Sequence, residues 1–478
     1  MTINDQHPVA RLRAAATSQP MAPALSVGDD TLMYGELWEA LGRWTRVMTG
    51  VGLMPGRPVA IVSRSRSRQA RAIWLAVFAG CPVLPVNPSH PSARHLISDC
   101  GIGQAIADAD IDVPDGIRRL PARRLDAIPD GPAIPGMPLG LEAPQLLVAT
   151  SGTAGAPRAA MLSCANLSAS ATNTCTAVEL KSDDTWLACL PLTHIAGIAI
   201  LFRCATAGAC VRLHEHFKPE EIWHEICSNS ISHVSLVPSM LFRVLEHSED
   251  AAPPFFMRQA LIGGSPLSVP LGRRARNAGW PLRETYGMTE TASHVALAAR
   301  SDWKLGLDPM PDVDIMIVDE NGRPTTGSGR IRISGPSVML GYANAGFSPG
   351  NGLTAEQTIT SHDLGRLDED GRLRIVGRAD AMLVSGGTNI HPGEVESLLA
   401  GCPGVHEAAV TGLPDPVWGH RLIALYTGEA EAAAVSEWAQ GAIIRPMRPS
   451  EFPRIDALPR NALGKLRRSD LPALVPRN

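Results

Sequence analysis

Small and hydroxylic residues follow a short apolar run about a third of the way along the chain. Leu146–Val148 is predicted to be a buried strand, and a loop leaves its end. Glycine lets backbone N–H groups approach a ligand without an intervening Cβ, and hydroxyl groups supply further donors. The loop is therefore a candidate for holding phosphate oxygens, with an ordinary surface turn as the alternative. Its candidate binding residues are Thr150, Ser151, Gly152, Thr153 and Gly155.

A second candidate group is the stretch ETYGMTET, residues 284–291. Its side chains supply hydroxyl and carboxylate oxygens. The alternative is structural: Tyr286 would be a core aromatic residue, and Glu290 a carboxylate favoured at the start of a helix by the helix dipole.

Isolated polar residues stand at the ends of other predicted elements. His194 lies just beyond the predicted strand Thr185–Leu190, and Asp363 directly precedes Leu364. A satisfied loop histidine and a surface turn aspartate are their structural alternatives. Lys465 lies among arginines near the end of the sequence, where a solvated run of charge is the alternative.

The loop sequence TSGTAGAPRAAMLS resembles the phosphate-loop signature of the adenylate-forming superfamily, which comprises acyl-CoA synthetases, adenylation domains and luciferases. Ordered matches over most of the chain are far more specific than one motif, and LPLTHIAGIAILFR with YGMTETASH is most similar to o-succinylbenzoate CoA ligases. The other stretches that recur in the family's order are LPLTHIAG from Leu190, ETYGMTETAS from Glu284, HDLGRLDEDG from His362, IVGRADAMLVSGGTNIHPGEVE from Ile375 and PRNALGKLRRSDL from Pro459.

This resemblance implies roles for the nucleotide-binding residues. The Tyr286 ring would lie against adenine and the Thr289 hydroxyl on the α-phosphate, while Glu290 and Thr150 would bind Mg²⁺. Asp363 would accept hydrogen bonds from both ribose hydroxyls. Its partner Arg378 would be a second ribose or phosphate contact.

The resemblance also implies an acyl pocket and a thiol passage. His194 would line the pocket, and we assign no proton transfer to it. Gly264 would border adenine. Lys465 would be catalytic, bridging the acid and ribose-side oxygens. The remaining residues implied by the resemblance are Gly263, Ser265, Gly287 and Thr291 in the pocket, and Gly386 and Gly387 along the path of the thiol arm.

One departure from the family lies in the phosphate loop. The usual Gly-Lys-Pro-Lys-Gly is replaced by Gly155-Ala156-Pro157-Arg158-Ala159, so one lysine is missing and the other is arginine. Arg158 can still pair bidentately with a phosphate. We therefore expect the change to affect pyrophosphate affinity more than catalysis.

Periodicity predicts alternating helices and strands before the loop. Tyr34–Val51 and Gln69–Ala79 have helical spacing, while Pro58–Val62 and Val83–Val86 read as strands, an alternation that favours a parallel sheet covered by helices. Residues 113–138 are rich in proline and arginine, and an irregular, partly mobile connection is predicted there.

Three further local predictions concern the middle of the chain. A helix starting near Ser163 would complete a strand–loop–helix unit and add its dipole to the phosphate site. A β-hairpin region is predicted over Gly327–Tyr342. A second hairpin is predicted around Asp370-Gly371.

The fold class that follows is α/β. A large N-terminal domain, residues 1–379, would combine parallel or mixed sheets covered by helices with a β-barrel-like part, and would bind ATP and the acid. Residues 380–478 would form a small mobile α+β lid domain. The resemblance places the hinge at Asp380, and Pro392 to Gly401 has the signals of a helix start and stop.

Composition restricts the class of protein. The chain has 478 residues, 45% hydrophobic and 19% charged, with a net charge of -4, so we expect a globular protein without a nucleic-acid partner. No signal peptide or membrane span is predicted, which indicates a cytoplasmic protein. The nine scattered cysteines are expected to be small buried residues, and His214, His216 and His224 to decorate a solvated helix instead of binding a metal.

The resemblance implies an ATP-dependent acid–thiol ligase that uses Mg²⁺. A carboxylate would attack the α-phosphorus of ATP, release pyrophosphate and form an acyl-adenylate, which the thiol of coenzyme A would then attack. Its partner would be a small carboxylic acid, and the resemblance leaves a homodimer open. Two alternatives remain: a stand-alone adenylating enzyme that acylates an amine or a carrier-protein thiol, and a degenerate nucleotide-binding relative, against which the retained Glu290, Asp363, Arg378 and Lys465 argue.

Overall fold

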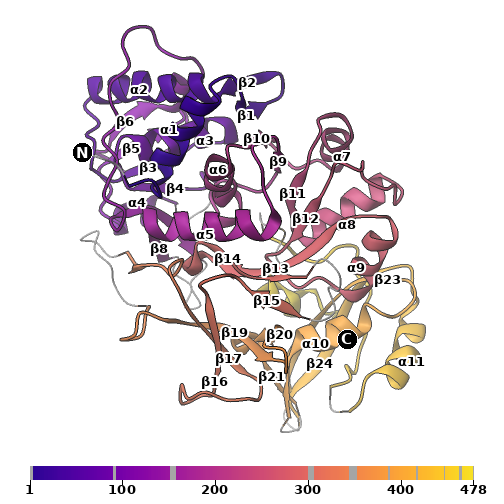
Figure 1. Ribbon diagram of the computed structural model, residues 1–478. Coiled ribbons are helices and arrows are strands. Elements are labelled where there is room, and N and C mark those ends of the chain that lie inside the picture. Colours follow the sequence, from indigo (N-terminus) through magenta and orange to yellow (C-terminus); the bar gives the residue numbers. More distant parts are fainter. Residues whose placement is uncertain are drawn as a thin grey trace.

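Two large sheets and one small sheet organise the computed structural model (Figure 1). The structure describes residues 4–89, 93–150, 158–299, 306–343, 352–385, 388–415, 418–445, 447–461, 464 and 466–476.

The seven-stranded sheet has the order β18-β8-β7-β4-β3-β5-β6. Its strands from β7 to β6 are parallel, whereas β8 runs antiparallel to both β7 and β18. β3 is buried along its whole length, as expected for a parallel strand covered on both faces. The bounds are β3 Val59–Val62, β4 Val83–Pro85, β5 Gln104–Ala107, β6 Arg118–Pro121, β7 Pro144–Thr150, β8 Arg158–Ser163 and β18 Gly341–Tyr342.

Helices of the first part of the chain cover this sheet. α2 buries Leu37, Leu41, Trp44 and Met48 on one face, the stripe that its sequence period predicted. The N-terminus of α3 is capped twice, because the Ser65 hydroxyl accepts from the Arg68 amide and the Glu215 carboxylate accepts from two further amides. The bounds are α1 Pro8–Ser18, α2 Tyr34–Gly50, α3 Arg66–Phe78, α4 Ala93–Asp99 and η1 Ala122–Leu125.

The thirteen-stranded sheet changes character at β13. From β1 to β13 the neighbouring strands are parallel, apart from the edge strand β2, and from β13 to β16 they are antiparallel. The antiparallel half lies where a barrel-like part was expected, and its strands continue the same sheet. The bounds are β1 Pro23–Val27, β2 Asp30–Met33, β9 Thr185–Ala188, β10 Cys210–Leu213, β11 His233–Leu236, β12 Gln259–Ile262, β13 Leu282–Met288, η2 Thr289–Thr291, β14 Ser293–Ala298, β15 Leu307–Pro309, β16 Asp314–Val318, β17 Gly329–Ser334, β19 Ile359–Leu367 and β20 Leu373–Arg378.

Two helices join the large sheets into one body. α5 contacts β7 and β8 of one sheet and β14 of the other, while α6 packs on α5, β9 and β10, as Figure 1 shows at the centre of the molecule. A single apolar cluster runs through this region, with Trp186, Leu201 and Val148 fully buried in it. The helix bounds are α5 Cys164–Val178, α6 Ile195–Ala207, α7 Pro219–Ser228, α8 Pro238–His247 and α9 Val269–Asn277.

The C-terminal part has its own small sheet, of order β22-β21-β24-β23, and its own apolar core. α10 starts with Pro392 at its first position and ends before Gly401, as its sequence predicted. The bounds are η4 Ala379–Ala381, β21 Leu383–Ser385, β22 Thr388–Ile390, α10 Pro392–Leu399, β23 Val405–Asp415, β24 Gly419–Gly428, α11 Ala432–Ala442 and η5 Arg468–Leu474. No helix within the described ranges is long and apolar enough to cross a membrane.

Two local predictions about strand connections were wrong. Strand β8 lies between the loop and α5, so the unit is a β-hairpin and not strand–loop–helix. The N-terminus of α5 therefore stands at the far end of β8 from the loop, although Ser163 does cap it. The hairpin predicted over Gly327–Tyr342 is also absent, because β17 pairs with β16 and β19 whereas β18 joins β8 in the other sheet.

Two further predictions need correction. Residues 118–125 of the supposed irregular connection form β6 and η1, and Leu120 and Leu125 are buried. His214 and His216 precede α7 and do not decorate it. His214 is mostly buried, and its Nε2 lies 3.4 Å from Oε1 of Glu225. The same carboxylate forms an ion pair with Arg212. Eight of the nine cysteines are buried, as predicted, and only Cys227 is exposed.

Candidate functional site

Four parallel strands end at one edge of the large sheet and bring several candidate residues together. β9, β11, β12 and β13 are consecutive neighbours in the sheet. Their carboxyl ends lead to His194, to Ser239, to Gly263–Ser265 and to Gly287. The carboxyl edge of an open parallel sheet is where such folds bind ligands, so the strand order itself selects this edge.

The Asp363 cluster, which we define as Tyr286, Ser361, Asp363 and Arg378, lies where β13 approaches the antiparallel half. Asp363 and Arg378 are opposite each other on β19 and β20, so their 3.3 Å contact is a direct cross-strand pair. The Tyr286 hydroxyl donates to Asp363 Oδ2 over 2.8 Å. Burial, followed by the charge of Asp363, raises the pKa of Tyr286, so its hydroxyl remains a donor.

Arg378 is shared between two carboxylates. Besides its contact with Asp363, it donates from Nε to Asp380 Oδ1 over 2.8 Å and from Nη2 to Asp380 Oδ2 over 2.5 Å. The hydrogen bonds to Asp380 raise the pKa of Arg378. For Asp380, partial burial alone would raise the carboxyl pKa, but Arg378 outweighs it and the net shift is downward. The predicted hinge residue is therefore tied to the Asp363 cluster.

The Glu290 cluster, which we define as Arg158, Glu290 and Tyr342, lies at the first residue of β8, where η2 and β18 approach that strand. The Tyr342 hydroxyl donates to Glu290 Oε1 over 2.7 Å. The Arg158 guanidinium carbon lies 3.9 Å from the centroid of the Tyr342 ring, on its face. Within the described ranges no carboxylate forms an ion pair with Arg158, and no group of three or more His, Cys, Asp or Glu is arranged to hold a metal.

The threonines occupy different environments. Thr150 pairs with Arg158 across the hairpin, and its hydroxyl donates to the Arg158 carbonyl over 3.2 Å. Thr289 is half-buried at the start of η2. Thr291 is fully buried, and its hydroxyl contacts the carbonyls of Met288 and Ser293 at 3.2 and 3.1 Å. The structure therefore uses Thr291 to hold the turn and does not bring its side chain to the site surface.

Backbone geometry explains the small residues around the strand ends. A Cβ on Gly263 would clash with the Thr285 hydroxyl, and one on Gly287 would clash with the Ser293 carbonyl. Gly264 has a φ of 80°, which favours glycine. Ser265 follows it and is half-buried. The His194 carbonyl accepts from the Gly197 and Ile198 amides of α6.

Several predicted site residues lie outside the described ranges. They are Ser151, Gly152, Thr153, Gly155, Gly386, Gly387 and Lys465.

The residue before Lys465 is nevertheless placed. A Cβ on Gly464 would lie 2.7 Å from the Ser239 hydroxyl, and the Gly464 carbonyl accepts from Arg460 over 2.6 Å. One turn further along α8, the centroid of the Phe242 ring lies 6.0 Å from that of the His406 ring in the C-terminal part. The C-terminal segment thus contacts the large sheet's carboxyl edge at α8.

Sequence reasoning missed two members of these clusters. The Ser361 hydroxyl accepts from the Asp363 amide over 3.0 Å, a local turn that the spacing Ser-x-Asp could have indicated. Tyr342 was assigned only to a hairpin. Nothing near it in the sequence points to Glu290, which is 52 positions away.

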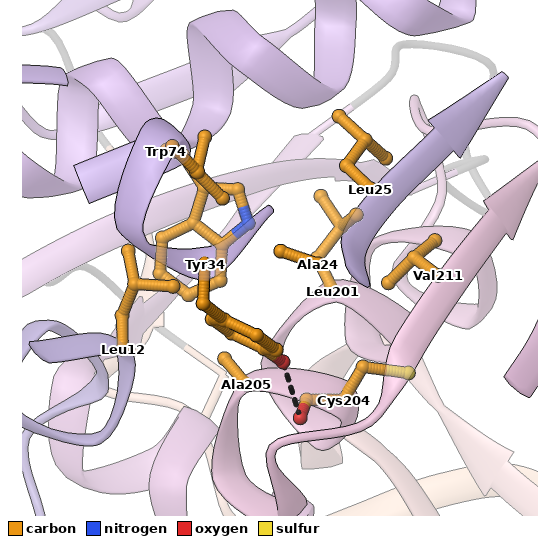
Figure 2. Close-up of a pocket in the computed structure, with 10 residues that line it drawn as sticks. Leu12, Ala24, Leu25, Tyr34, Trp74, Leu201, Cys204, Ala205 and Val211 are labelled. Carbon is orange, nitrogen blue, oxygen red and sulfur yellow. Dashed lines mark hydrogen bonds between the residues drawn. The ribbon is translucent and has the colours of Figure 1, made fainter. Parts of the chain in front are cut away.

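A small enclosed space lined by Leu12, Tyr34, Trp74 and Leu201 contains none of these site residues and is a packing gap. Figure 2 shows its lining, with the Tyr34 hydroxyl bonded to the Cys204 carbonyl. Its volume of about 10 Å³ is at the lower limit for one water molecule. It cannot hold an organic substrate.

Comparison with known proteins agrees with this geometry. The family model described as AMP-binding enzyme matches residues 12–343, and the one described as AMP-binding enzyme C-terminal domain matches residues 394–465. The chain is 32% identical over 480 residues to a 2-succinylbenzoate–CoA ligase of Geobacillus kaustophilus, covering 98% of both chains. It is 32% identical over 428 residues to a feruloyl-CoA synthase of Amycolatopsis, covering 86% of both.

A solved structure gives the same result. The o-succinylbenzoate coenzyme A synthetase of Bacillus subtilis, in complex with ATP and a magnesium ion, superposes with a TM-score of 0.86 at 28% identity, covering 97% of this chain and 99% of that one.

Proposed function

Because the chain belongs to the AMP-binding enzyme family, we propose how its own residues carry out that chemistry. The chain is an AMP-forming acid–CoA ligase: it activates a carboxylic acid as acyl-AMP, with release of pyrophosphate, and transfers the acyl group to coenzyme A. ATP, Mg²⁺ and coenzyme A are the cofactor and co-substrates. The observation that carries the residue assignment is the Asp363 cluster at the carboxyl edge of the large sheet.

We assign the adenosine end of ATP to that cluster. Each carboxylate oxygen of Asp363 accepts one protein hydrogen bond and retains a lone pair, so the pair of oxygens suits two ribose hydroxyls. The Tyr286 ring, whose hydroxyl is fixed by Asp363, offers a face to adenine beside Gly264. Arg378 supplies a further donor to ribose or phosphate.

The residues of the Glu290 cluster fit a magnesium ion. Mg²⁺ is usually held by one or two carboxylates together with substrate phosphates, and Glu290 has a half-buried carboxylate next to the strands that bound the phosphate loop. When bound there, Mg²⁺ would offset negative charge on the phosphate oxygens. Thr150 is the second proposed ligand, Thr289 the contact to the α-phosphate, and Arg158 with the loop residues the contacts to the other phosphates.

A carboxylate needs this site because its direct reaction with a thiol would expel oxide, a very poor leaving group. Attack on the α-phosphorus of ATP forms the acyl–phosphate bond and breaks the bond to pyrophosphate. We assign Lys465 to this step, since a cation between the acid and the ribose-side oxygens orients the nucleophile and reduces charge repulsion.

We infer an aromatic carboxylic acid as the substrate. The names of the relatives contain 2-succinylbenzoate and feruloyl, and both of these acids carry a benzene ring. His194, Gly263, Ser265 and Gly287 lie around the strand ends where such an acid would meet ATP. The buried Thr291 would shape this pocket indirectly, by holding the turn between Met288 and Ser293.

The pocket assignment is tested by pyrophosphate exchange with the purified chain over a panel of carboxylic acids, followed by acceptor assays with coenzyme A, amines and carrier proteins. We expect one aryl acid to support exchange and coenzyme A to accept its acyl group. Exchange with aliphatic acids alone would overturn the pocket assignment, and transfer only to an amine or a carrier protein would favour the alternative enzyme class.

We further propose two domains, residues 1–379 and a small mobile domain of residues 380–478, with the hinge at Asp380. Lys465 would occupy the path of the thiol during adenylation, so the small part must turn before coenzyme A can enter past Gly386. The separate apolar core of the C-terminal sheet supports this division.

Two variants separate the half-reactions. Lys465→Ala should lose pyrophosphate exchange yet still convert supplied acyl-adenylate to thioester, whereas Gly386→Leu should keep exchange and lose thioester formation. Equal loss of both activities in either folded variant would argue for one fixed conformation.

Two remaining proposals concern the setting of the enzyme. ATP and coenzyme A as substrates support a cytoplasmic location. A homodimer is tested by light scattering, against the chain mass of 50.7 kDa.

A further inference from the structure

Tyr342 contacts two residues with proposed roles in binding Mg²⁺-ATP. Its hydroxyl donates to Glu290 Oε1 over 2.7 Å, and its ring lies beneath the Arg158 guanidinium at 3.9 Å. The family resemblance assigned no function to this tyrosine. Its two contacts use different parts of the side chain, so they can be removed one at a time.

The backbone, and not these side-chain contacts alone, brings the three residues together. β18 is paired with β8 so that Tyr342 lies opposite Ala160, and Arg158 is two residues from Ala160 on the same face. This makes Arg158 the diagonal cross-strand neighbour of Tyr342. The Met339 amide donates to the Glu290 carbonyl over 2.8 Å, which fixes the turn that carries Glu290 beside the same strand.

The arrangement orients the Glu290 carboxylate without neutralising it. A phenol supplies a hydrogen bond but no positive charge, and within the described ranges it is the one donor to this carboxylate. The Arg158 guanidinium contacts the face of the Tyr342 ring, whereas Glu290 contacts the hydroxyl of that residue.

We propose that Tyr342 is a positioning residue, which orients Glu290 for Mg²⁺ through its hydroxyl and supports Arg158 next to the phosphate loop through its ring. This inference rests on the proposed function, in which Glu290 meets the metal and Arg158 the phosphates. It explains how Arg158, which stands where the family's usual loop has a lysine, is held in a defined position.

Tyr342→Phe isolates the hydroxyl. The phenylalanine ring keeps the contact with Arg158, while Glu290 loses the donor that orients it. A hydrogen bond to a charged group is worth roughly tenfold or more in an equilibrium, so we expect the Mg²⁺ concentration for half-maximal pyrophosphate exchange to rise roughly tenfold. The KM for the acid should stay unchanged.

Tyr342→Leu removes the ring as well. It should show the same Mg²⁺ defect as Tyr342→Phe and, in addition, the raised KM for ATP that Arg158→Ala shows alone. In the double variant Arg158→Ala, Tyr342→Leu, the two effects on the KM for ATP should not add, because both remove one contact. Full additivity of the two effects would show that the role of Arg158 does not depend on the Tyr342 ring.

The matched control is Tyr426→Phe. The Tyr426 hydroxyl donates to the Ala430 carbonyl over 2.7 Å inside the small sheet's core, so its loss also removes one phenol hydrogen bond but lies away from Glu290. Its Mg²⁺ requirement should equal that of the natural chain. Circular dichroism checks the fold of the phenylalanine variant, and Tyr342→Leu, which also lacks the hydroxyl, repeats the Mg²⁺ comparison if that variant folds poorly.

Binding of a non-hydrolysable ATP analogue, measured by calorimetry with and without Mg²⁺, gives a readout independent of turnover. Tyr342→Phe should bind the analogue normally without Mg²⁺ and lose most of the strengthening that Mg²⁺ adds. If the natural chain neither binds the analogue nor exchanges pyrophosphate, the proposed function fails. If it does both and Tyr342→Phe keeps its Mg²⁺ dependence, only the role of Tyr342 is overturned.

Discussion

The Asp363 and Glu290 clusters are linked through the chain, because Tyr286 lies in β13 and Glu290 in η2 directly after it, but they balance their charges differently. In the Asp363 cluster both carboxylate oxygens already have donors, and Arg378 is shared with Asp380. In the Glu290 cluster a neutral phenol contacts the carboxylate, and the nearby cation lies on an aromatic face. The first cluster is an internally paired network, while the second keeps its charges apart.

The difference matches the ligands that we assign to each. Ribose hydroxyls are neutral and need an acceptor with a fixed direction, which a paired and therefore rigid carboxylate provides. A metal ion and phosphates carry charge, and a protein charge that is already neutralised would attract them less. Rigidity is therefore provided at one cluster by ion pairs and at the other by a hydroxyl and the backbone.

The largest effect is expected from Asp363→Asn. It removes the charge that both Tyr286 and Arg378 contact, and the acceptor proposed for two ribose hydroxyls. We expect adenylation efficiency to fall by roughly three orders of magnitude, the upper range for loss of one well-placed electrostatic group. Pyrophosphate exchange measures it, with Asp370→Asn at the exposed hairpin tip as the control. A loss below about threefold would remove Asp363 from the site.

Glu290→Gln should come next, with a loss of roughly two orders of magnitude in turnover with Mg²⁺-ATP. The amide can still accept from Tyr342, so the position of the side chain is kept and the lost charge is what is tested. Titration of Mg²⁺ in the exchange assay measures the effect, and Glu320→Gln in an exposed turn is the control. Adenylation equal to that of the natural chain would exclude Glu290.

Arg158→Ala should raise the KM for ATP by roughly tenfold, the scale of one charge-assisted contact, and lower the maximal rate less. Backbone and hydroxyl donors of the loop remain to hold the phosphates. Initial rates over a range of ATP concentrations separate the two constants. If all adenylation is lost at saturating ATP, arginine takes part in the chemistry itself in place of the missing lysine.

The smallest effect concerns pH and the Arg378–Asp380 pair. Because the folded-state pKa of Asp380 is lowered, the pair stabilises the fold above the ordinary aspartate pKa, and the contribution is lost as pH falls through the lower folded value. Both side chains are more than a third exposed, so we expect only about 0.5 kcal/mol. Melting temperatures of Asp380→Asn and the natural chain should differ slightly at pH 7 and converge as the pH falls below the ordinary aspartate pKa. A difference that grows on acidification would contradict the assignment.

Local signals in the sequence predicted the elements that depend on near neighbours. The Asp370-Gly371 turn predicted the β19–β20 hairpin, and that hairpin alone places Asp363 opposite Arg378. The cap at Ser163 and the proline at the start of α10 were equally local. These elements form from interactions within a few residues, and their signals survive in any tertiary setting.

Errors arose where a strand's partner is distant. The run RAAMLS was read as part of a loop before a helix, but it forms β8 because β7 and β18 both pair with it. The stretch RIRIS-GPSVMLGY alternates like a hairpin, yet its two strands join different sheets. Alternation reports which faces are buried and does not report which strand lies alongside.

The sequence by itself determined which chemical groups are available and the local elements that carry them: a glycine- and hydroxyl-rich loop, an acidic turn after β13, and a tight hairpin ending in Arg378. Only the tertiary structure decided which of these groups meet. The hydroxyl of Tyr286 reaches Asp363 across 77 positions and that of Tyr342 reaches Glu290 across 52, because strand order brings them together. Strand order follows from burying all sheets and helices at once, a property of the whole chain that no local pattern contains.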